Sequence, residues 1–337
     1  MRRILFANTS SFETASPNGA DISLEALCRR LAAQSFEPVV LCGLRPGAPA
    51  SEHEPTAETP WRLLRAARPE RALGDAIARI TPIATVLRGG AAAAAVARNP
   101  AAFAQRLHVY FESGFVQRSY PSRRQAPDYR YAACSPFLAR LAETYFAAPV
   151  ATIPPIVEPD AYRAARPQSG DAVLFVNPVA VKGVHIAAAV AARLPRRRFL
   201  FARSWPDTAA HPHVEVALPN VEWLPAANDM RPIYAQARLV LVPSVWEESY
   251  GRVVGEAQIS GIPAVASDRG GLRETVGPGG IVLPLTAPLE AWCEAVESLF
   301  ADEAKYVALA QRARDHATRP DLAPDAIVER FLGWIGA

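Results

Sequence analysis

The sequence predicts two α/β domains, each built on a parallel sheet with helices on both faces. The chain has 337 residues, which is long for a single domain. Half of its residues are hydrophobic, which is enough for two sizeable cores. In the second half of the chain, short apolar strands alternate with amphipathic helices, the pattern of a doubly wound sheet.

Charge and cysteine usage narrow the class of protein. The net charge of +3 is small for this length and gives no reason to expect a nucleic-acid partner. The N-terminal segment MRRILFANTS contains too few apolar residues for a signal peptide. The sequence also has no run of 18 apolar residues, the length that a transmembrane helix needs. We therefore expect a cytoplasmic protein, with peripheral membrane contact left open. Four separated cysteines in apolar surroundings predict reduced, buried thiols: Cys28, Cys42, Cys134 and Cys293.

In the first half of the chain, patterns typical of strands and helices occur mainly near its two ends. Residues 44–70, rich in Pro, Ala and Glu, predict a long surface loop or lid rather than core. Three prolines and the lack of a helical period place the domain junction at 153–162. The predicted domains are thus 1–158 and 159–319, followed by a helix at 320–337 that crosses back to the first domain. The predicted strands of the first domain are 4–8, 38–41, 108–111 and 131–134, and its helices are 21–34 and 136–146.

The second half is more regular. We expect the ligand of this domain to bind at the carboxyl ends of the strands, as in other doubly wound sheets. The predicted strands are 173–176, 199–202, 221–224, 239–242, 264–266 and 281–283, and the helices are 184–194, 230–237 and 252–260.

Residues 239–276 carry the most chemical information. A buried strand ends at Pro243, an acidic loop follows, and a helix begins near Arg252. The unpaired N–H groups and positive dipole end of such a helix form an anion site. Glu248 and Glu256 flank this turn, and carboxylates accept hydrogen bonds from vicinal hydroxyls, as in ribose or a hexose. For Glu256 the alternative is an ordinary solvated helix charge.

This segment resembles the retaining glycosyltransferases of family 4, the glycosyl transferases group 1. The resemblance implies a GT-B fold, with two Rossmann-like domains that face a central cleft. It also implies that the N-terminal domain binds the acceptor and the C-terminal domain binds the nucleotide sugar. The matching frame contains the E-x7-E signature and its surroundings: Pro243, Ser244, Glu248, Tyr250, Gly251, Glu256, Ala257, Gly261, Pro263, Asp268, Gly270 and Gly271.

The resemblance also implies residue roles. Glu248 would bind the donor sugar, Glu256 the ribose, and the amides of the turn between them the diphosphate. Lys182 matches the family's phosphate-binding lysine, whereas Asn177 stands where the family has an arginine. Lys182 would therefore neutralise more of the diphosphate charge, assisted by Arg203 or Arg252. The implied donor-binding set is Asn177, Lys182, Arg203, Leu224, Glu248, Ser249, Tyr250, Gly251, Arg252 and Glu256.

The N-terminal half matches more loosely. Gly19 and Ala20 replace the usual glycine pair of a phosphate loop, and Gly19 is equally consistent with a simple turn. Glu112 stands near the family's His-Asp position, where it either contacts a substrate or caps the loop. We therefore take Glu248, Lys182 and Glu112 as candidate catalytic residues. His108 is expected to be packed, and the arginine-rich loop 118–130 either recognises an acidic acceptor or is simply solvated.

No metal and no cofactor are expected besides the nucleotide-sugar co-substrate. The sequence has no D-x-D, and its His and Cys residues do not cluster. The predicted activity is a retaining, metal-independent transfer of a hexose-type sugar from a UDP- or GDP-sugar to a small-molecule, glycan or lipid-linked acceptor.

Two other functions compete with this one. A non-catalytic sugar-nucleotide-binding module is favoured by the altered positions Asn177, Ala20 and Glu112. An NAD-dependent oxidoreductase is disfavoured because Gly277, Gly279 and Gly280 do not have the G-x-G-x-x-G spacing.

Overall fold

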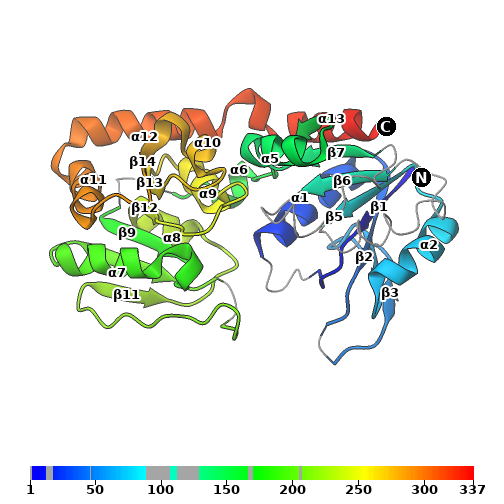
Figure 1. The fold of residues 1–337 in the computed structure, drawn as a ribbon, viewed down its shortest axis with the longest axis horizontal. Coiled ribbons are helices and arrows are strands. Elements are labelled where there is room, and N and C mark those ends of the chain that lie inside the picture. Colours follow the sequence, from blue (N-terminus) through cyan, green and yellow to red (C-terminus); the bar gives the residue numbers. More distant parts are fainter. Residues whose placement is uncertain are drawn as a thin grey trace. The chain divides into compact units, whose positions relative to one another are not determined.

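The computed structural model describes residues 2–12, 18–45, 47–88, 107–111, 129–165, 170–204 and 207–337. The chain forms two compact units (Figure 1). Unit 1 consists of Met1–Ile156 and Ala323–Ala337, and unit 2 of Val157–Leu322. Each unit has its own sheet and its own buried core, so the α/β fold class expected from the sequence is confirmed.

Unit 1 contains an eight-stranded sheet in the order β3-β4-β2-β1-β5-β6-β7-β8. Each pair in it is parallel except β3–β4, which is antiparallel. The central strands are buried on both faces, which explains their continuous apolar runs. The strands are β1 (Arg2–Ala7), β2 (Phe36–Cys42), β3 (Ser51–His53), β4 (Arg62–Arg65), β5 (Ala84–Arg88), β6 (Leu107–Phe111), β7 (Arg130–Ala133) and β8 (Val150–Thr152).

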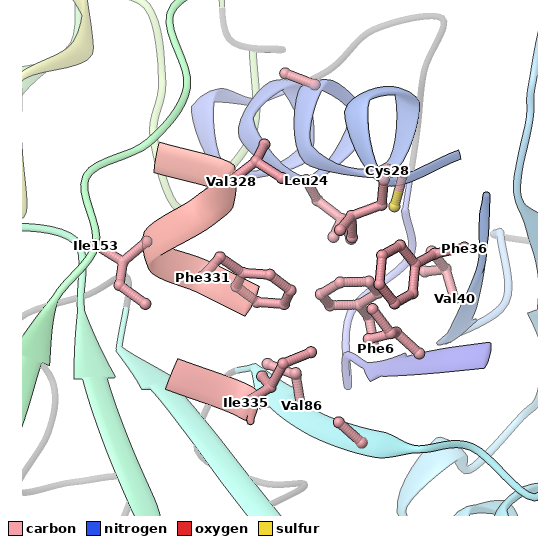
Figure 2. Packing of buried hydrophobic residues seen from close by; sticks show 14 of the residues in the cluster. Phe6, Leu24, Cys28, Phe36, Val40, Val86, Ile153, Val328, Phe331 and Ile335 are labelled. Atoms are coloured by element: carbon pink, nitrogen blue, oxygen red, sulfur yellow. The ribbon is translucent and has the colours of Figure 1, made fainter. Parts of the chain in front are cut away.

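The last helix of the chain, α13 (Pro324–Ile335), belongs to the core of unit 1. Figure 2 shows Val328, Phe331 and Ile335 of this helix among side chains from the sheet and from α1 (Gly19–Ala33). The rings of Phe331 and Phe6 stack with centroids 5.8 Å apart. Among the described residues, unit 1 also contains the helices α2 (Pro69–Ile80) and α5 (Pro136–Phe146).

The expectation of a long surface loop at 44–70 is only partly right, because two strands interrupt the exposed segments. The segment contains β3 and β4 and ends in the first turn of α2. Trp61 and Leu64 are only 2% and 6% exposed, because β4 extends the sheet beside β2. The two strands are too short, and too polar on their outer side, to show the alternation by which a strand is recognised.

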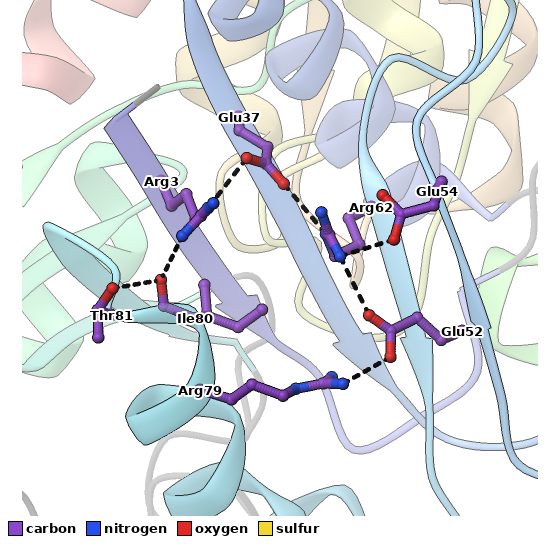
Figure 3. Close-up of polar contacts among 8 residues, drawn as sticks. All are labelled: Arg3, Glu37, Glu52, Glu54, Arg62, Arg79, Ile80 and Thr81. Atoms are coloured by element: carbon purple, nitrogen blue, oxygen red, sulfur yellow. Dashed lines mark hydrogen bonds and ion pairs between the residues drawn. The ribbon is translucent and has the colours of Figure 1, made fainter.

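Charged side chains stabilise this edge of the sheet (Figure 3). Arg62 pairs with Glu37 at 3.0 Å and with Glu54 at 2.7 Å, and Glu52 bridges Arg62 to Arg79. Burial raises the pKa of Glu37, but hydrogen bonds from Arg3 and Arg62 outweigh it and leave this pKa below its ordinary value. The segment that looked like a loop is therefore a charge-protected sheet edge.

Unit 2 contains a six-stranded parallel sheet in the order β11-β10-β9-β12-β13-β14. Numbered within the unit, this is the doubly wound order 3-2-1-4-5-6, and the order reverses between β9 and β12. The strands are β9 (Ala172–Val176), β10 (Arg198–Ala202), β11 (Val221–Leu224), β12 (Ala237–Val242), β13 (Ala264–Ser267) and β14 (Gly280–Leu283), and the helices are α6 (Pro159–Tyr162), α7 (Val184–Arg193), α8 (Arg231–Gln236), α9 (Arg252–Ile259), α10 (Leu272–Val276), α11 (Leu289–Ala301) and α12 (Glu303–Ala317).

Candidate donor site

The candidate site lies where the strand order of unit 2 reverses. Lys182 follows β9, and Glu248 follows its neighbour β12, so both lie beyond the carboxyl ends of the strands. Their side chains meet there, with Lys182 Nζ 2.6 Å from Glu248 Oε1. In doubly wound sheets this crevice is where ligands bind. Two residues that are 66 positions apart in the sequence thus form one ion pair at the expected place.

The surroundings of Glu248 favour its ionised form. Ser244, which is fully buried, donates its hydroxyl to Glu248 Oε1 at 2.6 Å. The Lys182 ammonium lies 4.6 Å from the centre of the Trp246 ring, a favourable cation–π distance. Burial raises the pKa of Glu248, but the charge and hydrogen bond of Lys182 outweigh it, so the pKa lies below its ordinary value.

Sequence reasoning assigned no role to Ser244 or Trp246. Both lie within four residues of Glu248, so their closeness in the chain was the available signal.

The backbone around Glu248 is held by a close contact with Gly270. The amide of Gly271 donates to the Glu248 carbonyl at 2.7 Å. Gly270 has a φ of 61°, and a Cβ placed on it would lie 2.1 Å from that same carbonyl oxygen. Only glycine fits this approach, which explains the Gly-Gly pair that follows β13.

The N-terminus of α9 has no side-chain cap. Among the described residues, none caps this helix through its side chain, and its first turn contains no acidic residue. Its N-cap, Gly251, has a φ of 88°, a left-handed conformation that glycine adopts without strain. The first-turn N–H groups and the positive dipole end of an uncapped helix suit a phosphate.

The N-terminus of α1 is different. Asn18 Oδ1 accepts from the amides of Ala20 and Asp21 at 2.9 and 3.0 Å, and Asp21 places a carboxylate in the first turn. An anion would have to displace this cap and approach a negative charge. The geometry therefore argues against a phosphate loop at Gly19 and Ala20.

Glu256 is buried, with only 6% of its surface exposed, so it is not a solvated helix charge. Arg252 Nε lies 2.7 Å from its Oε1, and the Tyr234 hydroxyl donates to its Oε2 at 2.9 Å. The Arg252 guanidinium also donates to the Tyr162 hydroxyl at 3.1 Å. Because this guanidinium is held against buried partners, the expectation that it assists the phosphate is not supported.

Asn177 and Arg203 occupy the remaining sequence-predicted positions. Asn177 is buried with a φ of 64°, and its amide donates to the Ala202 carbonyl at 2.9 Å. Asparagine is among the few residues that tolerate this left-handed conformation. Arg203 pairs with Glu215 and lies over the Trp223 ring, while its amide donates to the Leu224 carbonyl at 3.0 Å.

The other sequence-based predictions have mixed outcomes. His108 is packed, 3% exposed, with its ring 4.9 Å from that of Trp334. Of the four cysteines, all but Cys293 are buried. Glu112 and most of loop 118–130 lie outside the described residues. Within the part of the chain that is described, His, Cys, Asp and Glu form no group suited to a metal, and no helix is long and apolar enough to cross a membrane.

Known proteins resemble the chain in both sequence and fold. Residues 170–302 match the family model of glycosyl transferases group 1. The D-inositol 3-phosphate glycosyltransferase of Corynebacterium kroppenstedtii is 39% identical over 101 residues, which are 29% of this chain and 22% of that protein. That of Rhodococcus opacus is 38% identical over the same shares. The chain thus spans about a fifth of the length of these curated relatives.

Solved structures match over nearly the whole chain. Sucrose-phosphate synthase from Thermosynechococcus elongatus has a TM-score of 0.80 at 17% identity, covering 98% of this chain and 97% of that one. Anabaena Alr3699/HepE, solved with UDP-glucose, has a TM-score of 0.77 at 16% identity, covering all of both chains.

These similarities define the fold and one matching segment. The fold is that of the GT-B glycosyltransferases. The segment that resembles the glycosyl transferases group 1, residues 170–302, contains Lys182, Glu248 and Glu256.

Proposed function

We propose that the protein is a retaining glycosyltransferase that moves a hexose-type sugar from a UDP- or GDP-sugar to an acceptor hydroxyl. The observation that carries this proposal is the Lys182–Glu248 ion pair at the strand-order reversal of unit 2. It places one cation and one carboxylate beside each other, as a sugar diphosphate requires. The family match of residues 170–302 supports the same reading.

In this proposal the donor separates the two charges of the pair. The diphosphate takes over the Lys182 ammonium and binds the uncapped N-terminus of α9. Glu248 is then free to accept hydrogen bonds from the sugar hydroxyls, with Ser244 holding its carboxylate in place. Charge that develops on the leaving phosphate is stabilised by Lys182 and the helix amides, without a metal. The bond between the anomeric carbon and the phosphate oxygen breaks, and the acceptor oxygen bonds to that carbon on the same face. The departing phosphate accepts the proton of the acceptor hydroxyl, so the anomeric configuration is retained.

The comparisons suggest which substrates to test first. UDP-glucose is the first donor, because HepE was solved with it. An inositol phosphate is the first acceptor, because the curated relatives carry that name.

Nucleotide binding tests the site. We expect UDP or GDP, but not both equally, to raise the melting temperature of the wild type, since ligands that bind only the native state stabilise it. Lys182→Met should weaken nucleotide binding by about tenfold, the typical worth of a charged hydrogen bond. The matched control is Lys305→Met, because Lys305 is the other lysine of the chain and is exposed. Equal affinity in Lys182→Met and Lys305→Met would refute the assignment.

A measurement of turnover distinguishes a glycosyltransferase from a non-catalytic sugar-nucleotide-binding module. The module stays a candidate because Asn177 supplies no charge and Lys182 is neutralised by Glu248. Glu248→Gln should retain nucleotide binding but lose transfer from UDP- and GDP-sugars. Nuclear magnetic resonance of the product should show the donor's anomeric configuration, and EDTA should leave the rate unchanged. Binding without turnover, across a panel of acceptors, would favour the module instead.

A further inference from the structure

A second buried ion pair spans the first turn of α9. Arg252 and Glu256 face each other at 2.7 Å, with side chains only 12% and 8% exposed. Tyr234, from α8, donates to the other carboxylate oxygen of Glu256 at 2.9 Å. Tyr162, from α6, accepts from Arg252 at 3.1 Å. Side chains from three helices thus surround one carboxylate.

Burial favours the neutral form of Glu256. Removal from water raises the pKa of its carboxyl above the ordinary value, and the Arg252 charge and the Tyr234 hydrogen bond offset only part of this rise. The difference matters for recognition, because an ionised carboxylate only accepts hydrogen bonds, while a protonated one also donates. Its two oxygens offer about four acceptor positions, and Arg252, Tyr234 and Tyr162 use three of them. Capacity remains for one hydroxyl of a ligand.

We propose that Arg252 and Tyr234 are positioning residues for the nucleotide, acting through Glu256. They orient its carboxylate and favour its ionised form against the effect of burial, so that it accepts a hydrogen bond from a ribose hydroxyl of the donor. This inference rests on the proposed function, since it presumes a nucleotide at the end of α9.

The other groups around the pair fit this role. Tyr162 is anchored to α9, because the Ser260 hydroxyl donates to its carbonyl at 2.9 Å and accepts from the Ala164 amide at 2.8 Å. Its pKa is raised by burial and by Glu256, so its hydroxyl stays neutral at physiological pH. The titratable groups that face the Arg252–Glu256 pair are Tyr234, Tyr162 and Tyr250. All three are tyrosines, so Arg252 is the one cation among the groups around Glu256.

A double-mutant cycle tests the inference. UDP and GDP affinities are measured by calorimetry from pH 5.5 to 8.5 for the wild type, Arg252→Met, Glu256→Gln and the double variant. We expect Arg252→Met to lose about tenfold in affinity, the scale of a charged hydrogen bond, and to lose more as the pH falls. In the Glu256→Gln background, Arg252→Met should have little further effect and no pH dependence. Equal losses in both backgrounds would overturn the inference.

Further variants distinguish a loss of nucleotide affinity from a loss of folding. Arg252→Met leaves a buried unpaired carboxylate, which destabilises proteins, whereas the double variant removes both charges and should fold. Arg252→Lys keeps the charge and should restore most of the affinity. Tyr234→Phe keeps the ring and should weaken binding less than Arg252→Met, again only while Glu256 is present.

A ligand-free measurement distinguishes failure of this inference from failure of the proposed function. Infrared spectra report the protonated carboxyl band that Glu256→Gln removes. The band should be absent in the wild type at pH 7 and present in Arg252→Met. If no nucleotide bound the wild type but this pattern appeared, the proposed function would fail, while Arg252 would still control the charge of Glu256. A band already present in the wild type would overturn the inference itself.

Discussion

At the scale of single residues, the site depends on conformations that few side chains adopt. Asn177 follows β9 with a φ of 64°, at the position where the sequence comparison expected an arginine. A left-handed conformation costs most L-residues about 1–2 kcal/mol, and asparagine tolerates it better than most. The residue therefore has a structural reason to be there, independent of the charge that it lacks.

This interpretation predicts how the stabilities of two variants at position 177 compare. Asn177→Ala should lower the free energy of unfolding of unit 2 by about 1–2 kcal/mol more than Asn177→Gly, because only alanine is strained at positive φ. Both variants lose the same amide group, so their difference isolates the backbone term. Denaturant unfolding followed by Trp fluorescence measures it. Equal stability of the two variants would show that the conformation is not strained.

At the scale of elements, sequence signals differed in strength. Helix α5 was predicted with its observed bounds, because Ser135 caps it and Pro136 opens it. Strands β3 and β4 were missed, because they are only 3 and 4 residues long and their outer side chains are charged. What holds that edge together is an ion-pair network that no local pattern reveals.

The network predicts an acid-sensitive contribution to stability. The pKa of Glu37 lies below its unfolded value, so the carboxylate stabilises unit 1 above the unfolded pKa. This contribution is lost as the pH falls through the folded pKa. Glu37→Gln should remove about 1 kcal/mol or less at pH 7, since such partly solvated pairs are weak. Its melting temperature should fall less steeply than that of the wild type on acidification below the ordinary glutamate pKa. A wild-type curve parallel to that of Glu37→Gln would contradict the role of the network.

At the scale of the whole molecule, sequence motifs predicted the candidate donor residues but not the side chains that contact them. Glu248 and Glu256 were predicted from one motif frame, and Lys182 from the separate segment 173–183. Their polar contacts were not predicted, since Lys182 reaches Glu248 across 66 positions and Tyr162 reaches Arg252 across 90. Such contacts exist only once the parallel sheet brings the ends of distant strands and helices together. The last helix differs from these contacts, because the sequence already predicted that a helix at 320–337 crosses back to the first domain, and α13 lies in the core of unit 1.

That anchoring gives the final prediction. Phe331 of α13 is 2% exposed and stacks on Phe6 of β1, so Phe331→Ala should cost unit 1 about 3–5 kcal/mol. Hydrogen exchange should then speed up in β1, β2 and β5, while β9 and β12 keep their protection. Glu329→Ala, at an exposed position of the same helix, is the control and should change neither unit. Faster exchange in β9 and β12 as well would mean that α13 supports both units, and that the two cores do not unfold independently.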